Sequence, residues 1–134
     1  MSNTIYTDLS IKTFKDILEI VDDEEQTQTT AIIMKFGAEW CGPCKNIQPY
    51  CHEVFKKLDQ KIICFDLDID QEDNMELYLA YKQKKMITTI PVIFAYVSNP
   101  ERNKNHWWAP DFSVNSSQRH DVEQYFQKVL SLTR

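Results

Sequence analysis

The hydrophobic and polar positions of this chain fall into alternating strand-like and helix-like segments. Short apolar runs predict strands at 4–6, 31–36, 61–65 and 91–97, and the central runs are apolar on both faces, as in strands buried inside a sheet. Pro91 starts the last run at its first position, where a strand tolerates proline. Residues 106–109 are a further candidate, as an edge strand.

Four other segments repeat apolar residues at helical spacing. Ser10 suits the N-cap of the first helix, which would bury Ile11, Phe14, Ile17 and Leu18. The third helix, predicted over 72–85, should face the core with Met75, Tyr78 and Leu79. The second helix follows the cysteines with the apolar stripe Ile47, Tyr50, Cys51, Val54 and Leu58, and the last covers 121–132 with Val122, Tyr125, Phe126, Val129 and Leu130.

This order of elements predicts an α/β sandwich, with a central mixed β-sheet flanked by helices on both faces. The 134 residues contain no internal repeat and no low-complexity linker, so we expect a single domain over 1–134. The acidic and polar stretch 22–30 is expected to be a solvated loop.

Composition and net charge argue against some kinds of binding partner. A formal net charge of −5 argues against nucleic-acid or anionic-membrane binding by general electrostatics. No stretch reaches the roughly 18 apolar residues that span a bilayer, and no secretory signal is visible at the start of the sequence. We therefore expect a monomer in the cytoplasm, where a Cys-x-x-Cys pair is more often catalytic or metal-binding than a structural crosslink.

The segment Cys41-Gly42-Pro43-Cys44 carries the candidate chemistry. It follows an apolar strand and begins a helix, where free backbone N–H groups and the helix dipole stabilise a thiolate at Cys41. Cys44 lies one turn later and can close a small disulfide, while Pro43 stiffens the turn between the two sulfurs. The pair is the minimum equipment for reversible thiol–disulfide exchange.

A zinc site is the alternative chemistry, with Cys51 and His52 as further ligands by type. Adjacent residues on a helix point about 100° apart, and Cys51 belongs to an apolar stripe, so we expect no metal. Cys51 and Cys64 are expected to be small buried hydrophobes, and His52, His106 and His120 to be surface residues.

The sequence around the cysteines resembles the thioredoxin family. The matching strings are Phe36-Gly37-Ala38-Glu39-Trp40-Cys41-Gly42-Pro43-Cys44-Lys45, Pro49, Ile69-Asp70-Gln71 and Ile90-Pro91. The resemblance extends over about 5–132 and implies the thioredoxin fold and protein-disulfide reductase activity.

The resemblance also assigns roles to residues. It implies that Cys41 is a partly exposed nucleophile, that Cys44 is the resolving thiol, and that Trp40 contacts the substrate. It further implies a cis peptide bond between Ile90 and Pro91, with the backbone before the proline pairing with a substrate strand. No nucleotide motif occurs, so no bound cofactor is expected, and electrons would come from NADPH through a separate flavin enzyme of the thioredoxin-reductase type.

One departure from the family concerns charge. Lys35 stands where the family usually has an acid beneath the second cysteine, and Asp66 stands where it has a lysine, so the two charges look exchanged. The exchange would either preserve a structural ion pair or stabilise the thiolates, which would make the couple less reducing. Asp66 would take over proton transfer from Cys44 only if its carboxylate reaches that thiol.

Two other functions stay open at this point. The long segment 98–115, with Trp107, Trp108 and Phe112, mildly favours a non-catalytic interaction module, and adjacent tryptophans in a strand would point to opposite faces. The charge exchange leaves a disulfide oxidase or isomerase possible. Asn115 is the best local substitute for a family glycine, because asparagine tolerates left-handed backbone angles.

Overall fold

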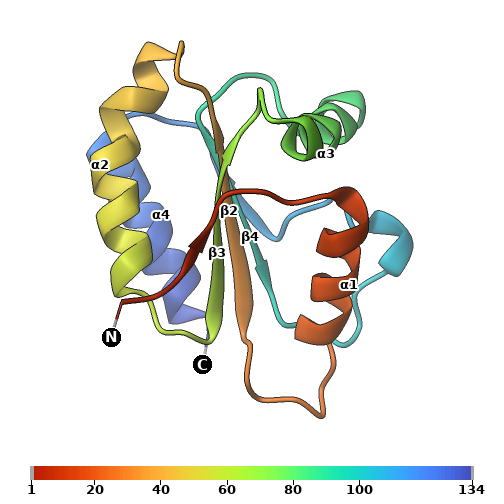
Figure 1. The fold of residues 1–134 in the computed structure, drawn as a ribbon. Helices are drawn as coiled ribbons and strands as arrows, with labels where there is room; N and C mark the ends of the chain where they lie inside the picture. Colours follow the sequence, from red (N-terminus) through yellow and green to blue (C-terminus); the bar gives the residue numbers. More distant parts are fainter. Residues whose placement is uncertain (1, 134) are drawn as a thin grey trace.

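The computed structural model describes residues 2–133 and places five strands in one sheet between two pairs of helices (Figure 1). The strands are β1 (Ile5–Tyr6), β2 (Ala31–Gly37), β3 (Ile62–Asp68), β4 (Val92–Val97) and β5 (Phe112–Val114). The helices are α1 (Ile11–Val21), α2 (Gly42–Lys57), α3 (Glu72–Gln83) and α4 (Arg119–Ser131), with a short 3-10 helix, η1 (Lys104–His106). Residues 1 and 134, the ends of the predicted domain, lie outside the described residues.

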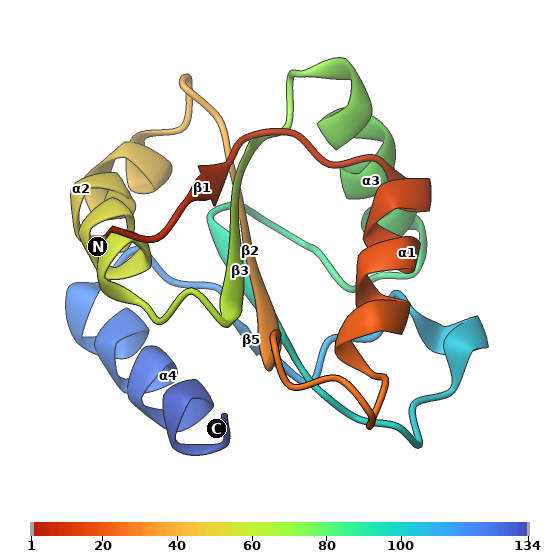
Figure 2. The ribbon, with the colours of Figure 1, turned by 60° about the horizontal axis from the view of Figure 1, so that its bottom comes forward.

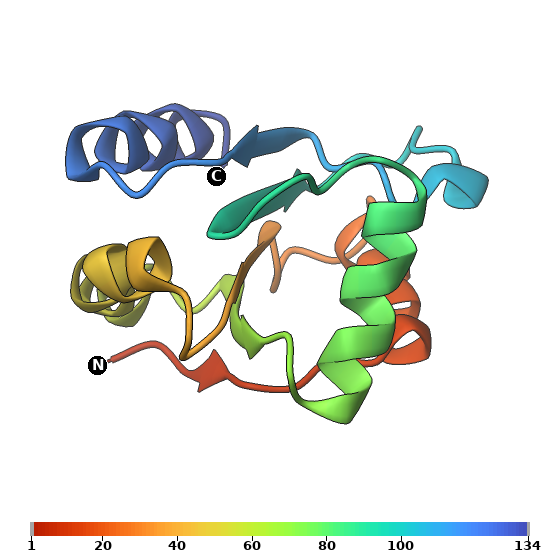
Figure 3. The same ribbon diagram turned by 90° about the horizontal axis from the view of Figure 1, so that it is seen from above.

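The sheet is mixed, and its strand order is β1-β3-β2-β4-β5. β1, β3 and β2 are parallel, whereas β4 and β5 run antiparallel to their neighbours. Helices α2 and α4 cover one face and α1 and α3 the other (Figures 1 and 3). The predicted fold class is confirmed, and the central strand β2 leads directly into the cysteine segment at the start of α2.

Local sequence explains most of the elements. All seven residues of β2 are buried, as expected for a central strand with helices on both faces. The Ser10 side chain accepts a hydrogen bond from the Thr13 N–H, so the predicted N-cap of α1 is confirmed. Two hydrophobic clusters, one on each side of the sheet, make up the core.

The buried face of α3 differs from the prediction. Met75 and Leu79 are 40% and 54% exposed, whereas Asn74, Leu77 and Tyr81 are buried. The reason is polar: the Asn74 carboxamide accepts from the Leu9 N–H and donates to backbone carbonyls of the loops that flank β1 and β3. Satisfying those loop groups turns an asparagine inward and moves two apolar residues to the surface.

The segment between β4 and β5 also differs from the prediction. Residues 106–109 form no edge strand; the chain passes through η1 beside α1 and returns to the sheet at β5 (Figure 2). Trp107 and Trp108 are both half-buried against the same core cluster, because they lie in a turn, where the alternation of a strand does not apply. Trp107 packs edge-on against the rings of Phe14 and Tyr81.

Arg102 holds this segment in place. Its guanidinium donates to Asp22 at 2.8 Å, to Asp111 at 2.9 and 3.0 Å, and to the Val97 carbonyl at 2.7 Å. The group also lies over the Tyr96 ring, with its carbon 5.3 Å from the ring centre. Asp22 is therefore a structural partner, although it begins the stretch that was predicted to be a solvated loop.

We expect Arg102→Met to lower the free energy of unfolding by about 2–3 kcal/mol, because two carboxylates would lose their shared cation. Urea denaturation measures the change. Lys104→Ala is the matched control, since Lys104 and Glu19 form an exposed ion pair whose loss should cost less than about 1 kcal/mol. Equal losses in the two variants would contradict an anchoring role for Arg102.

Candidate active site

Cys41 and Cys44 form a disulfide at the N-terminus of α2. Their Cα atoms are 5.2 Å apart, and the Cys41 residue is the N-cap of the helix, with extended backbone angles. The Cys41 sulfur accepts a hydrogen bond from the Cys44 N–H at 3.2 Å. Pro43 lies in the first turn, where its missing N–H costs no helical hydrogen bond. The start of the helix thus directs the Cys44 N–H toward the first sulfur.

The Cys41 side chain is buried, whereas its neighbour Trp40 is exposed. Cys41 is 6% exposed, so the expected partial exposure is wrong for this disulfide form. Its sulfur lies 3.8 Å from the Ile90 carbonyl oxygen, and the peptide bond between Ile90 and Pro91 is cis, as the resemblance implied. Trp40 is 68% exposed, and its indole N–H donates to Asp70 at 2.9 Å, which holds the ring beside the disulfide.

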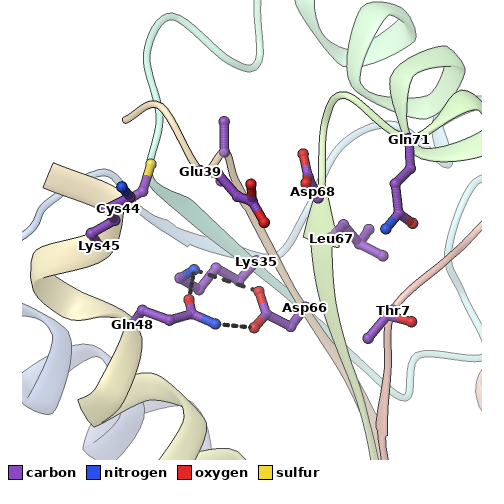
Figure 4. A pocket seen from close by; sticks show the side chains of 12 residues that line it. Thr7, Lys35, Glu39, Cys44, Lys45, Gln48, Asp66, Leu67, Asp68 and Gln71 are labelled. Atoms are coloured by element: carbon purple, nitrogen blue, oxygen red, sulfur yellow. Dashed lines mark hydrogen bonds and ion pairs between the residues drawn. The ribbon is translucent and has the colours of Figure 1, made fainter. Parts of the chain in front are cut away.

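Lys35 and Asp66 meet beneath the second cysteine. They are register partners on β2 and β3, with the Lys35 ammonium 3.5 Å from the Asp66 carboxylate. Gln48 of α2 joins them, accepting from Lys35 through Oε1 and donating to Asp66 through Nε2 (Figure 4). The Lys35 side chain is 2% exposed, so its charge is buried and matched by these two partners.

Gly37 leaves an open space between this group and Cys44. A Cβ atom placed on Gly37 would lie 3.4 Å from the Lys35 Nζ and 3.5 Å from the Cys44 Sγ. Both atoms therefore border the point that a side chain at position 37 would occupy. They line a cavity of about 350 Å³ that Asp66 and Gln48 also line. Within residues 2–133 no hydrogen bond joins Asp66 to Cys44, so direct contact, the condition for proton transfer, is not met.

Sequence reasoning missed Gln48 and gave Asn115 a different role from the one that the structure shows. Gln48 lies one helical turn after Cys44, so it faces the same side of α2, and that spacing could have indicated it. Asn115 was proposed as a substitute for glycine, but Lys85, with φ of 61°, is the non-glycine residue of positive φ in the described chain. Asn115 instead hydrogen-bonds through its side chain to the loop around Pro91.

The other candidate ligands and nucleophiles lie apart from this site. Across residues 2–133 no group of three or more His, Cys, Asp or Glu side chains is placed to hold a metal ion. Cys51 and Cys64 are buried free thiols in the core cluster beside α2 and α4, and burial raises the pKa of Cys51 to about 11 and that of Cys64 to about 12. His52, His106 and His120 are exposed.

These raised pKa values predict which thiols resist alkylation. At pH 8 fewer than about one in a thousand Cys51 side chains is a thiolate, so Cys51 and Cys64 of the folded, reduced protein should stay unlabelled by iodoacetamide. Labelling should rise toward pH 11 at Cys51 and about one unit later at Cys64, measured by mass spectrometry of peptides. The free energy of unfolding depends on pH with the same sign. The contribution of these two buried thiols is fully present below pH 9 and is lost as the pH rises through their raised pKa values.

Denatured protein is the control for this experiment. Unfolding removes the burial that raises both pKa values, so all four cysteines should then react together at pH 8. Rapid labelling of Cys51 or Cys64 in the folded protein at pH 8 would contradict the assignment.

Curated thioredoxins resemble this chain, and some of them are longer than it. The sequence is 28% identical to thioredoxin 3 of Plasmodium falciparum over 102 residues, which are 76% of this chain and 49% of that protein. It is 29% identical to the mitochondrial thioredoxin of Bos taurus, over 70% of this chain and 54% of that protein. It is also 29% identical to a thioredoxin of Rickettsia felis, over 77% of this chain and 82% of that protein. The chain thus spans about half the length of the first two.

Solved structures have the same fold. A Plasmodium falciparum thioredoxin superposes with a TM-score of 0.61 at 26% identity, covering 93% of this chain and 97% of that one. A chain in the crystal structure of the complex of ferredoxin:thioredoxin reductase and thioredoxin f2 superposes with a TM-score of 0.65 at 20% identity. The match covers 95% of this chain and 96% of that one.

Family membership rests on the sequence model described as Thioredoxin, which matches residues 10–106. The match includes the strand β2, the disulfide pair and the cis-proline, the three elements that build the site. The chain belongs to the thioredoxin family.

Proposed function

We propose that this protein reduces protein disulfides by dithiol–disulfide exchange through Cys41 and Cys44. The observation that carries the proposal is the Cys41–Cys44 disulfide at the N-terminus of α2, beside the exposed Trp40 and the backbone of Ile90. The first sulfur accepts a hydrogen bond from the Cys44 N–H at the helix N-terminus, which stabilises the thiolate that attacks. The second lies one turn deeper, where it can displace a bound substrate.

The exchange proceeds in two steps. The Cys41 thiolate attacks one sulfur of the substrate disulfide, forms a mixed disulfide and expels the other substrate sulfur as a thiolate. The Cys44 thiolate then attacks the Cys41 sulfur, closes the intramolecular disulfide and releases the second substrate sulfur. Two electrons pass to the substrate, the released thiolates take up protons from solvent, and the protein ends in the oxidised form seen here.

An external reductant must restore the dithiol. We assign this role to a thioredoxin-reductase-like flavin enzyme that uses NADPH. Free buried thiols at Cys51 and Cys64 favour a reducing compartment, and we assign the cytoplasm. Protein disulfides are the proposed substrates, and a monomer is the proposed working unit. In the described part of the chain no helix has the length and apolar character needed to cross a membrane.

A more oxidising role is the second candidate function. It is favoured by the Lys35 ammonium, which borders the Cys44 sulfur across Gly37 and stabilises thiolate. A cation there favours the reduced form and so makes the disulfide a better oxidant.

Insulin reduction with dithiothreitol as the electron source tests the proposal, together with a glutathione titration of the Cys41/Cys44 couple. We expect catalysed insulin precipitation and a potential between about −270 and −200 mV. A potential near about −120 mV would identify an oxidase. Absence of catalysis in a folded protein with both thiols intact would refute enzyme function and favour the interaction module.

A further inference from the structure

The loop that carries the cis-proline is held from one side by Asn115. The Asn115 carboxamide donates to the Thr89 carbonyl at 3.0 Å and to the Pro91 carbonyl at 2.8 Å. Its oxygen accepts from the Thr89 hydroxyl at 2.9 Å. One exposed side chain therefore spans the backbone on both sides of Ile90, across a sequence separation of 24 to 26 residues.

These contacts fix the orientation of the amide. Two carbonyl oxygens accept and cannot donate, so the NH₂ group must face them, and the oxygen must face the hydroxyl. Both amide hydrogens and the oxygen are then used. An aspartate at this position would lack both donors, and a glycine would lack the group entirely, so the contact is specific to the asparagine.

The position of Asn115 in the sheet explains why a side chain is needed there. The antiparallel pairing of β4 and β5 ends at Ile93 and Val114, and Asn115 is the first residue after β5. Two residues before Ile93 stands Pro91, which has no N–H to continue a ladder. The Asn115 side chain supplies donors to the Thr89 and Pro91 carbonyls just beyond the end of that pairing.

The held segment leaves Ile90 itself available. Within residues 2–133 the Ile90 N–H donates no hydrogen bond, and its carbonyl oxygen lies 3.8 Å from the Cys41 sulfur without a backbone donor. An extended chain placed along Ile90 would find one free donor and one free acceptor, the pattern that adds a strand to an edge. The residues on both sides are already occupied by Asn115.

We propose that Asn115 is a positioning residue, which holds Thr89 and Pro91 so that the backbone of Ile90 is preorganised to pair with a polypeptide substrate. This inference rests on the proposed function, since it concerns the same substrate site. It separates two classes of substrate. A polypeptide disulfide uses the Ile90 backbone, whereas a small aromatic disulfide reacts at the sulfur without pairing to a strand.

The test compares insulin with 5,5′-dithiobis(2-nitrobenzoate) as substrates of the full chain. Asn115→Ala should raise KM for insulin roughly three- to ten-fold and leave kcat and the rate with the small disulfide within about two-fold. Asn115→Asp should raise KM further, because a carboxylate would face two carbonyl oxygens. Asn105→Ala, an exposed asparagine in η1, is the matched control and should change neither substrate.

The outcomes separate positioning from stability and from the proposed function. Circular dichroism and urea unfolding establish that each variant is folded. Equal losses with insulin and the small disulfide, or an unchanged KM for insulin, would overturn the positioning role while the wild type remains an active reductase. An inactive wild type would overturn the proposed function and the inference with it.

Discussion

Cys41→Ser should abolish disulfide reduction, whereas Cys44→Ser should form a stable mixed disulfide with its substrate. The structure makes the two sulfurs unequal: Cys41 caps α2 beside Ile90 and Trp40, and Cys44 lies one turn deeper against Gly37. Removing the attacking thiol should lower insulin reduction by roughly a thousand-fold or more. Removing the displacing thiol leaves the first step intact and blocks release of the substrate. Non-reducing electrophoresis with a thiol-free chase detects the mixed disulfide that accumulates.

The buried thiol Cys51 supplies the control for these variants. Cys51→Ala removes a sulfur from the same helix without touching the disulfide, and it should keep insulin reduction within about two-fold of the wild type. Full activity in Cys41→Ser would refute the catalytic assignment, and trapping by Cys41→Ser in place of Cys44→Ser would reverse the assigned roles.

Contiguous signals in the sequence predicted the parts of this site that local geometry determines. The string around Cys41 and Cys44 combines a strand end, an N-cap position and a first-turn proline, and each acts within a few residues. The apolar runs identified the central strands, because a central strand must be apolar on both faces. Fold class and disulfide pair were therefore predictable from neighbouring residues alone.

Long-range polar contacts could not be predicted in the same way. Asn74 turns inward to donate to the carbonyls of Thr7 and Asp68. Arg102 holds the 98–111 segment by binding the carboxylate of Asp22 at the end of α1 and that of Asp111. Asn115 closes on a loop more than 20 residues away. Hydrophobic periodicity does not distinguish a buried polar residue from an exposed one, so a prediction based on it places every polar residue on the surface.

The exchange of Lys35 and Asp66 should make this couple less reducing than the reverse arrangement would. We expect the double variant Lys35→Asp with Asp66→Lys to lower the redox potential by about 30–60 mV, because an anion would replace the cation that borders the Cys44 sulfur. A glutathione titration measures the shift. The double variant keeps one charge of each sign, so a change in its redox potential reports which strand carries the cation and is not an effect of net charge.

Two further variants show whether a change in redox potential comes from the position of the cation, from net charge or from loss of stability. Lys35→Asp alone should also lower the potential, but it sets two carboxylates in register on β2 and β3 and should destabilise the fold. Lys57→Glu makes the same formal change at the exposed far end of α2, where solvent and salt screen it, and should leave the potential unchanged.

The sign of the shift is what tests the electrostatic interpretation. Reduction converts the disulfide into thiols that ionise, so any group that stabilises thiolate stabilises the reduced form and raises the potential. Lys35 is buried and held by Gln48, and its Nζ and the Cys44 Sγ lie 3.4 and 3.5 Å from the point that a Cβ on Gly37 would occupy, so solvent screens its charge little. If the double variant is no more reducing than the wild type, the buried pair is structural, and the cation beneath the disulfide has no part in setting its potential.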